Sequence, residues 1–336
     1  MTIMNRRFVL ASRPTAATRE DHFRLETVSL PELAPGQVLV RHHYLSLDPY
    51  MRGRMSDQKS YAAPQPLGEV MLGGTAGEVV ASQSTNLVVG DRVVGMGGWQ
   101  DYSVVADKAV RKVDVSPVPL SAYLGAVGMP GVTGWYGLHM ICEPKAGETV
   151  AVSAASGAVG GVVGQLAKAK GCRVVGIAGG KPKCDYVTGE LGFDACIDYK
   201  AAPDPAAFAA MLADATPAGI DGYFENVGGM ILDAVLARMN AFGRIAICGM
   251  IAGYEGAPLP LAQPALILQS RLKVQGFIVS EQPAVWPKAL AELGAGVASG
   301  AIKYRETVAS GLDRAPAAFI GLLHGENFGK QLVKLI

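Results

Sequence analysis

The stretch from Thr149 to Gly171 constrains the fold of this chain more than any other feature of the sequence. It begins with the apolar run Thr149–Ser153, breaks into glycine and small residues, and continues over 165–171 as a helix-like segment that ends on glycine. A strand, a glycine turn and a helix N-terminus in this order form an anion site, because backbone N–H groups converge there and the helix dipole favours negative charge. A second apolar run, Arg173–Ala178, follows at the distance that a βαβ unit requires. The stretch therefore predicts a βαβ unit that binds a dinucleotide.

The glycines of this turn, Gly157, Gly160 and Gly164, depart from the G-x-G-x-x-G pattern, because Ala155 stands where the first glycine would be. The spacing alone is compatible with dinucleotide binding and also with an ordinary glycine-rich connection between a strand and a helix. The flanking strands and helix favour dinucleotide binding, since missing side chains let a pyrophosphate approach the backbone.

The composition argues against several classes of protein. Half of the 336 residues are hydrophobic and 18% are charged, which suits a compact α/β protein of two domains. A net charge of +1, with no Lys/Arg run longer than two, argues against a nucleic-acid partner or an anionic membrane surface. The glycines of the uncharged span 149–167 argue against a membrane helix, and the apolar run 8–11 is too short for a signal peptide. The five cysteines are scattered without a C-x-x-C pair, which is typical of reduced thiols in a cytoplasmic protein.

The pattern of secondary structure changes near residue 120. Short strand-like runs separated by proline and glycine turns fill residues 1–120, which predicts a small β-barrel or sandwich-like domain completed by residues 300–336. Residues 121–299 alternate strands and helices, which is typical of a doubly wound parallel sheet with its ligand at the carboxyl ends of the strands. We expect strands at 149–153, 173–178, 195–198, 222–225, 244–248 and 272–279, and helices at 159–170, 182–191, 204–214, 230–240, 260–269, 283–299 and 315–323.

The end of the second strand indicates the type of cofactor. Proteins that select NAD usually place Asp or Glu there to hold the ribose 2′-hydroxyl. Residues 177–183 contain no acid but do contain Lys181 and Lys183. A carboxylate would repel a 2′-phosphate, whereas lysine and nearby backbone N–H groups would attract it. The lysines are also compatible with a solvated charged loop, but we favour NADP(H).

The histidines do not indicate a metal site. His22, His42, His43, His139 and His324 form no cluster with Cys or Glu at ligand spacing, and neighbouring residues of a strand point to opposite faces. We therefore predict that the chain binds no metal, so that charge on an alkoxide must be stabilised by other groups. A Ser-His-Asp arrangement or a nucleophile elbow is not evident either.

Six motifs in order along nearly the whole chain resemble those of the zinc-independent medium-chain dehydrogenases/reductases. Within this family they are most similar to the group of leukotriene B4 12-hydroxydehydrogenase/prostaglandin reductases, plant alkenal double-bond reductases and bacterial curcumin reductase-like enzymes. The motifs are the glycine turn, SLDPYMR at 46–52, GMPGVT at 128–133, FENVGG at 224–229, GRIAICGMI at 243–251 with Tyr254, and APAAFIGLL at 315–323 with Asn327 and Gly329-Lys330.

The resemblance implies a GroES-like β-barrel catalytic domain beside a Rossmann domain, in a homodimer. By position, the cofactor pyrophosphate would lie on Gly157, Ala158, Val159 and Gly160, the 2′-phosphate on Lys183, and the adenosine along Tyr199, with Asn226 contacting the cofactor from the end of its strand. The nicotinamide half would be lined by Cys248, Gly249, Met250, Tyr254, Phe277, Ile278 and Val279, with Asn327 reaching in from the C-terminal segment. Apart from the motifs, Cys248 could equally be a core thiol, Phe277 a packing residue, and Asn226 and Asn327 turn residues.

Similar enzymes reduce the carbon–carbon double bond of α,β-unsaturated aldehydes and ketones, so the resemblance implies an NADPH-dependent 2-alkenal/enone reductase. Hydride passes to the β-carbon, the carbonyl oxygen takes up enolate charge, and the α-carbon is then protonated. We expect Tyr254 first and Tyr50 second to donate a hydrogen bond to that oxygen, since a phenol is neutral at pH 7.

The sequence leaves two questions about this activity open. Gln269 stands where some relatives carry a tyrosine proposed as proton donor, so the identity of that donor is not fixed. The alternatives to the reductase are an NADPH:quinone oxidoreductase of the same superfamily and a catalytically silent nucleotide-binding protein.

Overall fold

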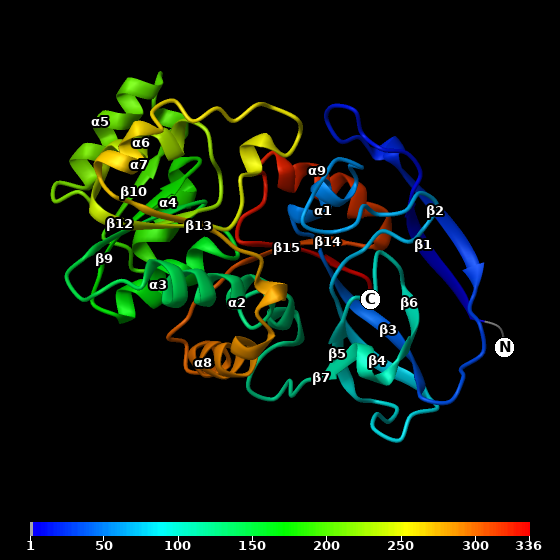
Figure 1. The fold of residues 1–336 in the computed structure, drawn as a ribbon. Coiled ribbons are helices and arrows are strands. Elements are labelled where there is room, and N and C mark those ends of the chain that lie inside the picture. The colour runs from blue at the N-terminus through cyan, green and yellow to red at the C-terminus, as the bar shows by residue number, and fades with distance from the viewer. Residues whose placement is uncertain (1–2) are drawn as a thin grey trace.

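The alternating strands and helices of the chain form a six-stranded parallel sheet in the computed structural model, which describes residues 3–336 (Figure 1). The strand order β10-β9-β8-β11-β12-β13 places β8, the strand before the glycine turn, near the centre. This order is that of a doubly wound Rossmann sheet, so the predicted fold class is confirmed. The strands are β8 (Thr149–Ser153), β9 (Arg173–Ala178), β10 (Ala195–Asp198), β11 (Ile220–Glu225), β12 (Met239–Ile247) and β13 (Lys273–Gly276).

Helices accompany these strands close to the expected positions. They are α2 (Met129–Tyr136), the π-helix η4 (Gly137–Cys142), α3 (Gly160–Ala169), α4 (Lys181–Gly189), α5 (Pro205–Ala215), α6 (Met230–Arg238), α7 (Ala265–Gln269) and α8 (Trp286–Ala298). The helix expected over 260–269 begins only at Ala265, because Pro260 and Pro264 lack the N–H group that a helix interior needs. The strand expected over 272–279 is also shorter, since the chain leaves the sheet after Gly276 and Val279 begins a 3-10 turn.

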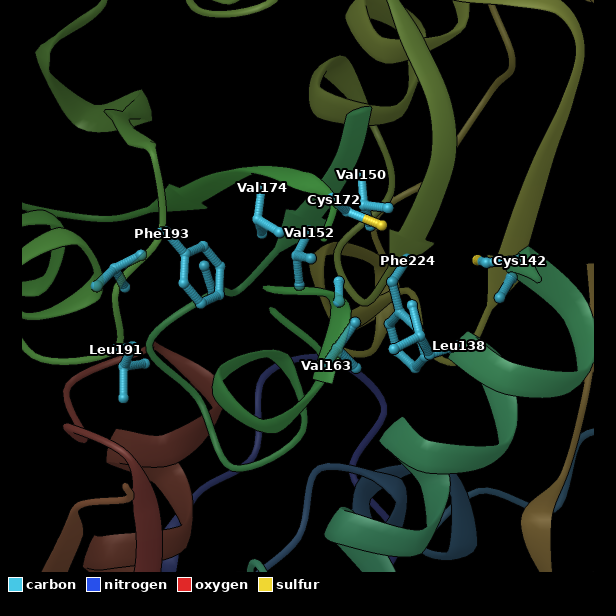
Figure 2. Packing of buried hydrophobic residues seen from close by; sticks show 14 of the residues in the cluster. Leu138, Cys142, Val150, Val152, Val163, Cys172, Val174, Leu191, Phe193 and Phe224 are labelled. Carbon is cyan, nitrogen blue, oxygen red and sulfur yellow. The ribbon is translucent and has the colours of Figure 1, made fainter. Parts of the chain in front are cut away.

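The core of the parallel sheet explains one of the three glycines of the turn. Figure 2 shows Val150, Val152, Val174 and Phe224 of the sheet packed with Leu138, Val163, Leu191 and Phe193. A Cβ on Gly164 would lie 1.8 Å from Cζ of Phe193, so only glycine lets the ring pack against α3. Burying one such ring contributes about 2–3 kcal/mol to folding. Gly164 is therefore a packing residue of this core.

A second, mainly antiparallel sheet combines the two ends of the chain. Its order is β14-β15-β3-β4-β5-β7, with β6 paired to β3, and Figure 1 shows the orange and red C-terminal strands in the same lobe as the blue N-terminal ones. Helix α9 (Ala315–Leu323) packs on this lobe, where the Phe319 ring meets Trp99 at 5.6 Å and Trp99 stacks on Phe23 at 5.1 Å. The strands are β3 (Gln37–Ser46), β4 (Thr75–Ser82), β5 (Arg92–Gly95), β6 (Tyr102–Ala106), β7 (Val110–Lys112), β14 (Glu306–Ser310) and β15 (Lys330–Lys334), beside the separate pair β1 (Met4–Leu10) and β2 (Phe23–Ser29). The domain boundaries at residues 120 and 299 stay a prediction.

Short helices connect these elements. Helix α1 (Tyr50–Arg54) has five residues, too few to show a period in the sequence, yet it carries one of the two candidate tyrosines. The 3-10 turns are η1 (Glu20–His22), η2 (Asp107–Ala109), η3 (Leu120–Leu124), η5 (Tyr199–Ala201), η6 (Ile251–Gly253), η7 (Val279–Glu281), η8 (Pro283–Val285) and η9 (Leu312–Arg314). Within residues 3–336, the structure contains no helix with the length and apolarity needed to span a membrane.

Candidate active site

The centre of the site is the point where the strand order of the parallel sheet reverses, between β8 and β11. Ser153 ends β8 and donates its hydroxyl to a carboxylate oxygen of Glu225 at 2.8 Å. Asn226, the next residue after β11, binds back to Ser153 twice, through its backbone N–H to Oγ at 2.8 Å and through its side-chain amide to the carbonyl at 2.7 Å. Asn226 thus fixes the spacing of the two strand ends where open α/β sheets bind their ligands.

The glycine turn is built by close backbone approach. Gly160 begins α3, and a Cβ there would lie 2.4 Å from the carbonyl oxygen of Ala154, whereas a Cβ on Gly157 would lie 3.1 Å from the same atom. The left-handed backbone of the turn falls on Ala154, with φ at 49°, and on neither of these glycines. The turn therefore requires glycine because a Cβ has no room beside the Ala154 carbonyl, and not because of a left-handed backbone. The absence of side chains leaves the N-terminus of α3 uncovered, as an anion site requires.

The C-terminal segment closes over the glycine turn. Gly329 forms an isolated parallel bridge with Gly157, which joins the segment before β15 to the turn after β8. The Asn327 side chain donates to the carbonyl of Gly329 at 2.7 Å, so it shapes this segment. Arg305 lies over the rings of Tyr186 and Phe328, with centroid distances of 4.6 and 5.0 Å, and holds the same contact between the lobes. The structure thus places Asn327 beside the residues predicted to hold the pyrophosphate.

The predicted 2′-phosphate residues meet around Gly179 at the end of β9. A Cβ on Gly179 would lie 3.0 Å from Cε1 of Tyr199, so the tyrosine ring covers this position. The N–H of Gly180 donates to Asp198 at 2.7 Å. Lys183 donates to the carbonyl of Gly325 at 2.7 Å, and burial, followed by repulsion from Lys200, lowers the pKa of its ammonium group. The two predicted residues, Lys183 in α4 and Tyr199 in η5, therefore both lie on elements next to the carboxyl end of β9.

Tyr254 follows β12, which lies on the opposite side of β8 and β11 from β9. Cys248 and Gly249 donate their backbone N–H groups to the carbonyl of Glu225, and this holds the chain before Tyr254 against the end of β11. A Cβ on Gly249 would lie 3.1 Å from the Tyr254 hydroxyl, so the phenol reaches over this glycine. Burial raises the pKa of Tyr254 to about 12, and the Met250 backbone opposes this rise in part. Tyr254 is therefore a neutral hydrogen-bond donor at pH 7.

Tyr50 begins α1 in the other lobe and shares the neighbour Tyr61 with Tyr254. Burial raises the pKa of its phenol above the ordinary value, and the charges of Asp48 and Tyr61 add to the rise. Tyr61 also contributes to the raised pKa of Tyr254, which shows that it neighbours both tyrosines. Below them, Lys330 donates to Asp48 at 3.0 Å and to the carbonyl of Leu47 at 2.5 Å, although both side chains of this ion pair are buried.

Several predicted residues have other surroundings. The ring of Phe277 packs against Tyr136 and Phe224, at centroid distances of 5.3 and 6.2 Å, so this side chain belongs to the core behind the sheet. Ile278 is half-buried, and Val279 packs on the cluster around α2 and α8. The Cys248 thiol is enclosed, and burial raises its pKa to about 12. Gln269 is exposed at the end of α7.

Two residues near the candidate tyrosines, Tyr61 and Glu255, were not predicted from the sequence. Tyr61 lies in an irregular loop without any pattern, and only its three-dimensional position next to Tyr50 and Tyr254 marks it. No sequence pattern indicated Glu255 either. Its carboxylate accepts a hydrogen bond from the N–H of Thr18 at 2.7 Å and contacts Nε2 of His324 at 3.1 Å. Glu255 therefore connects the Tyr254 loop to the lobe that carries Tyr50.

One of the histidines, at position 42, has the surroundings of a structural residue. His42 is buried between the carbonyl of Gln100 and the hydroxyl of Ser103, both at 2.9 Å, and burial lowers its pKa to about 4. Among residues 3–336, no group of three His, Cys, Asp or Glu side chains is arranged to hold a metal ion.

Two protein families match this chain. Residues 6–113 match the N-terminal domain of oxidoreductase, and residues 158–295 match a family described as zinc-binding dehydrogenase.

Individual relatives match over almost the full length. The NADPH-dependent curcumin reductase of Escherichia coli (strain K12) is 46% identical over 338 residues, which are 98% of this chain and 97% of the relative. The 2-alkenal reductase (NADP(+)-dependent) of Nicotiana tabacum is 41% identical and covers 98% and 97%. The crystal structure of CurA from Vibrio vulnificus in complex with NADPH superimposes with a TM-score of 0.93 at 47% identity, over 98% of this chain and 99% of that one.

Proposed function

The chain belongs to the zinc-independent medium-chain dehydrogenases/reductases, in the group of curcumin, alkenal and prostaglandin reductases. We propose that it binds NADPH and an α,β-unsaturated aldehyde or ketone at the carboxyl ends of the parallel strands. The chain is an NADPH-dependent reductase of the carbon–carbon double bond in these compounds. The observation that supports the location of the site is the neutral Tyr254 phenol, which lies over Gly249 at the carboxyl ends of the strands.

The residues of the candidate site fit an extended dinucleotide phosphate. Gly160 leaves the N-terminus of α3 bare, and Gly179 leaves room between β9 and Tyr199 that a side chain would fill. We assign the pyrophosphate to residues 157–160, the 2′-phosphate to Lys183 with the adenosine along Tyr199, and the nicotinamide half to residues 248–250. Asn226 and Asn327 hold the strand end and the covering segment in place through their own hydrogen bonds. Phe277 supports the site from behind through its packing on Phe224.

The tyrosines supply what the reaction needs from the protein. The cofactor, when bound, supplies the hydride that reduces the β-carbon. The carbonyl oxygen of the substrate then gains charge, and a donor that is already in place stabilises it without reorganisation. Tyr254 takes this role in our assignment and Tyr50 is the second donor, because a phenol is neutral at pH 7 and burial raises the pKa of both side chains further. Protonation at the α-carbon by a nearby donor or water completes the reduction.

The test is the loss of absorbance at 340 nm with NADPH or NADH and a panel of substrates. The panel contains a medium-chain 2-alkenal, an aryl enone, a quinone and a saturated aldehyde. We expect fast oxidation of NADPH, and much slower oxidation of NADH, with the alkenal and the enone only. Preference for the quinone would indicate a quinone oxidoreductase instead. Binding of NADPH without turnover of any substrate would indicate a silent nucleotide-binding protein.

We also propose that the chain forms a homodimer through the edge of the parallel sheet and acts in the cytoplasm. Strand β13 is at that edge, and the exposed side chains Phe242, Leu268 and Val274 lie on or next to it. Beside the edge is an apolar hollow of about 190 Å³, lined in part by Leu236, Ile267 and Val274. An open edge with apolar side chains favours pairing with a second copy. Elution at the 35.0 kDa mass of one chain would contradict the dimer, and the free state of all five cysteines is consistent with a reducing compartment.

A further inference from the structure

The fold brings together two cysteines that the sequence separates. Cys184 lies in the first turns of α4 and Cys196 lies in β10, and their sulfur atoms are 3.0 Å apart. The other cysteines have different partners: Cys142 and Cys172 each donate to a backbone carbonyl at 3.4 Å, and Cys248 is enclosed beside Glu225. Cys184 and Cys196 therefore form a thiol pair within reach of a disulfide.

The two thiols are not equivalent. The thiol of Cys196 donates a hydrogen bond to Cys184 and lowers the pKa of Cys184, while the same contact raises the pKa of Cys196. The position of Cys184 near the N-terminus of α4 acts in the same direction, since a helix N-terminus favours a thiolate. Cys184 is thus the nucleophile of the pair and Cys196 the thiol that resolves it.

The pair lies under the subsite that we assign to the 2′-phosphate. Lys183 directly precedes Cys184 in α4, and Asp198, two residues after Cys196, accepts the hydrogen bond of the Gly180 N–H at 2.7 Å. The two elements that carry the sulfur atoms are therefore the two elements that position the phosphate-binding loop. Any change of the distance between α4 and β10 moves this loop.

We propose that Cys184 and Cys196 form a reversible disulfide in response to hydrogen peroxide, and that this disulfide weakens the binding of NADPH. The effect on NADPH rests on the function proposed above, whereas formation of the disulfide does not.

The chemistry balances in two steps. The Cys184 thiolate attacks one oxygen of the peroxide, the O–O bond breaks, and sulfenic acid and hydroxide form. The Cys196 sulfur then attacks the sulfenic sulfur, and the thiol proton together with hydroxide leaves as water. In total the two thiols lose two electrons and two protons, and hydrogen peroxide is reduced to two molecules of water.

The disulfide weakens NADPH binding because of its length. A sulfur–sulfur bond is about 2.05 Å, so the sulfur atoms must approach by about 1 Å and pull the first turn of α4 toward β10. Lys183 moves with this turn, so its position relative to the carbonyl of Gly325, its present partner, changes. By thermodynamic reciprocity, bound NADPH must oppose formation of the disulfide by the same factor.

The experiment treats the purified full-length protein with hydrogen peroxide, with and without saturating NADPH, and maps its disulfides by mass spectrometry after blocking free thiols. NADPH affinity is measured directly by fluorescence titration before oxidation, after it, and after reduction with dithiothreitol. We expect a link between Cys184 and Cys196, a rise of about tenfold in the Kd for NADPH, equal to the loss of one charge-assisted hydrogen bond, and full recovery on reduction. NADPH should slow formation of the link.

Matched variants distinguish the effect of a disulfide between Cys184 and Cys196 from the effect of oxidation elsewhere in the protein. Cys184→Ser and Cys196→Ser should keep the affinity for NADPH after peroxide, whereas Cys172→Ser, which leaves the pair intact, should lose it like the wild type. Absence of the link in the wild type, or an unchanged Kd in protein that carries the link, would overturn the proposal even if a variant did not fold. A protein that binds NADPH and forms the link but reduces no enone would refute the proposed function alone.

Discussion

The candidate site has a cofactor end around the glycine turn and a substrate end around Tyr50 and Tyr254, and these two ends are built in opposite ways. At the cofactor end side chains are absent, since a Cβ on Gly160 would collide with the Ala154 carbonyl at 2.4 Å and one on Gly179 would lie 3.0 Å from the Tyr199 ring. At the substrate end bulky side chains are present, since Tyr50 and Tyr254 bring half-buried phenols from two different lobes.

This difference determines which property a substitution at each end reduces. A Cβ added at Gly160 cannot be accommodated, because the obstacle is the backbone carbonyl of Ala154 directly after β8, and we expect the stability of the fold to fall. An atom removed from a tyrosine leaves the fold intact and removes only a hydrogen-bond donor. We therefore expect substitutions at the cofactor end to reduce stability and affinity, and those at the substrate end to reduce turnover.

The largest effect is expected for Gly160→Ala. The new Cβ would lie 2.4 Å from the Ala154 carbonyl oxygen, and neither backbone can move without distorting β8 or α3. We expect a loss of about 3 kcal/mol or more in the free energy of unfolding, seen as a lower Tm, and no measurable binding of NADPH. Gly189→Ala is the matched control, because nothing lies within 4 Å of a Cβ at that position of α4. Equal Tm values for the two variants would show that the turn is not built by close approach.

The next effect is expected for Tyr254→Phe. Removing the hydroxyl should lower kcat/KM for an enone by about 100-fold and leave the Tm and the Kd for NADPH unchanged. Because the pKa of Tyr254 is about 12, wild-type activity should not fall through loss of this proton between pH 7 and 10; it would fall only as the pH approaches 12, where a phenolate can no longer donate. A larger loss in Tyr50→Phe than in Tyr254→Phe would exchange the two roles.

The same contrast explains how much the sequence could predict. The glycine turn and the strands around it are local features, and the expected strand β8 agrees with the observed one at both ends. Tyr61 and Glu255 belong to loops whose positions depend on contacts with segments far along the chain, so no spacing marks them. The resemblance implies that Phe277 lines the nicotinamide half, which stays a prediction. The packing of its ring against Tyr136 depends on a contact between distant segments, which the sequence could not place. The Cys184–Cys196 pair could not be predicted either, because the two thiols meet only when α4 packs against β10.

A smaller effect is expected for Lys183→Ala, which tests the one charged side chain assigned to the cofactor end. Loss of a charge-assisted hydrogen bond to the 2′-phosphate should raise the Kd for NADPH about tenfold and leave that for NADH unchanged. Lys181→Ala is the control, because this lysine is exposed and pairs with Asp185 at 2.8 Å on the surface of the same helix. If both cofactors lose affinity equally, Lys183 supports the fold of the loop and does not select the phosphate.

The smallest effect is expected for Glu255→Ala, which removes the connection between the two lobes next to Tyr254. Burial alone would raise the pKa of this carboxyl, but the Thr18 N–H and His324 outweigh burial and lower the pKa, so the group is charged at pH 7. A partly exposed contact of this kind contributes at most about 1 kcal/mol, and we expect kcat/KM for an enone to fall about threefold at an unchanged Kd for NADPH. Glu255→Gln keeps an acceptor for the Thr18 N–H, and His324→Ala removes only the second partner, so each should lose less than Glu255→Ala. If all three variants retain full kcat/KM, Tyr254 is positioned by its own loop and the connection between the lobes plays no part in turnover.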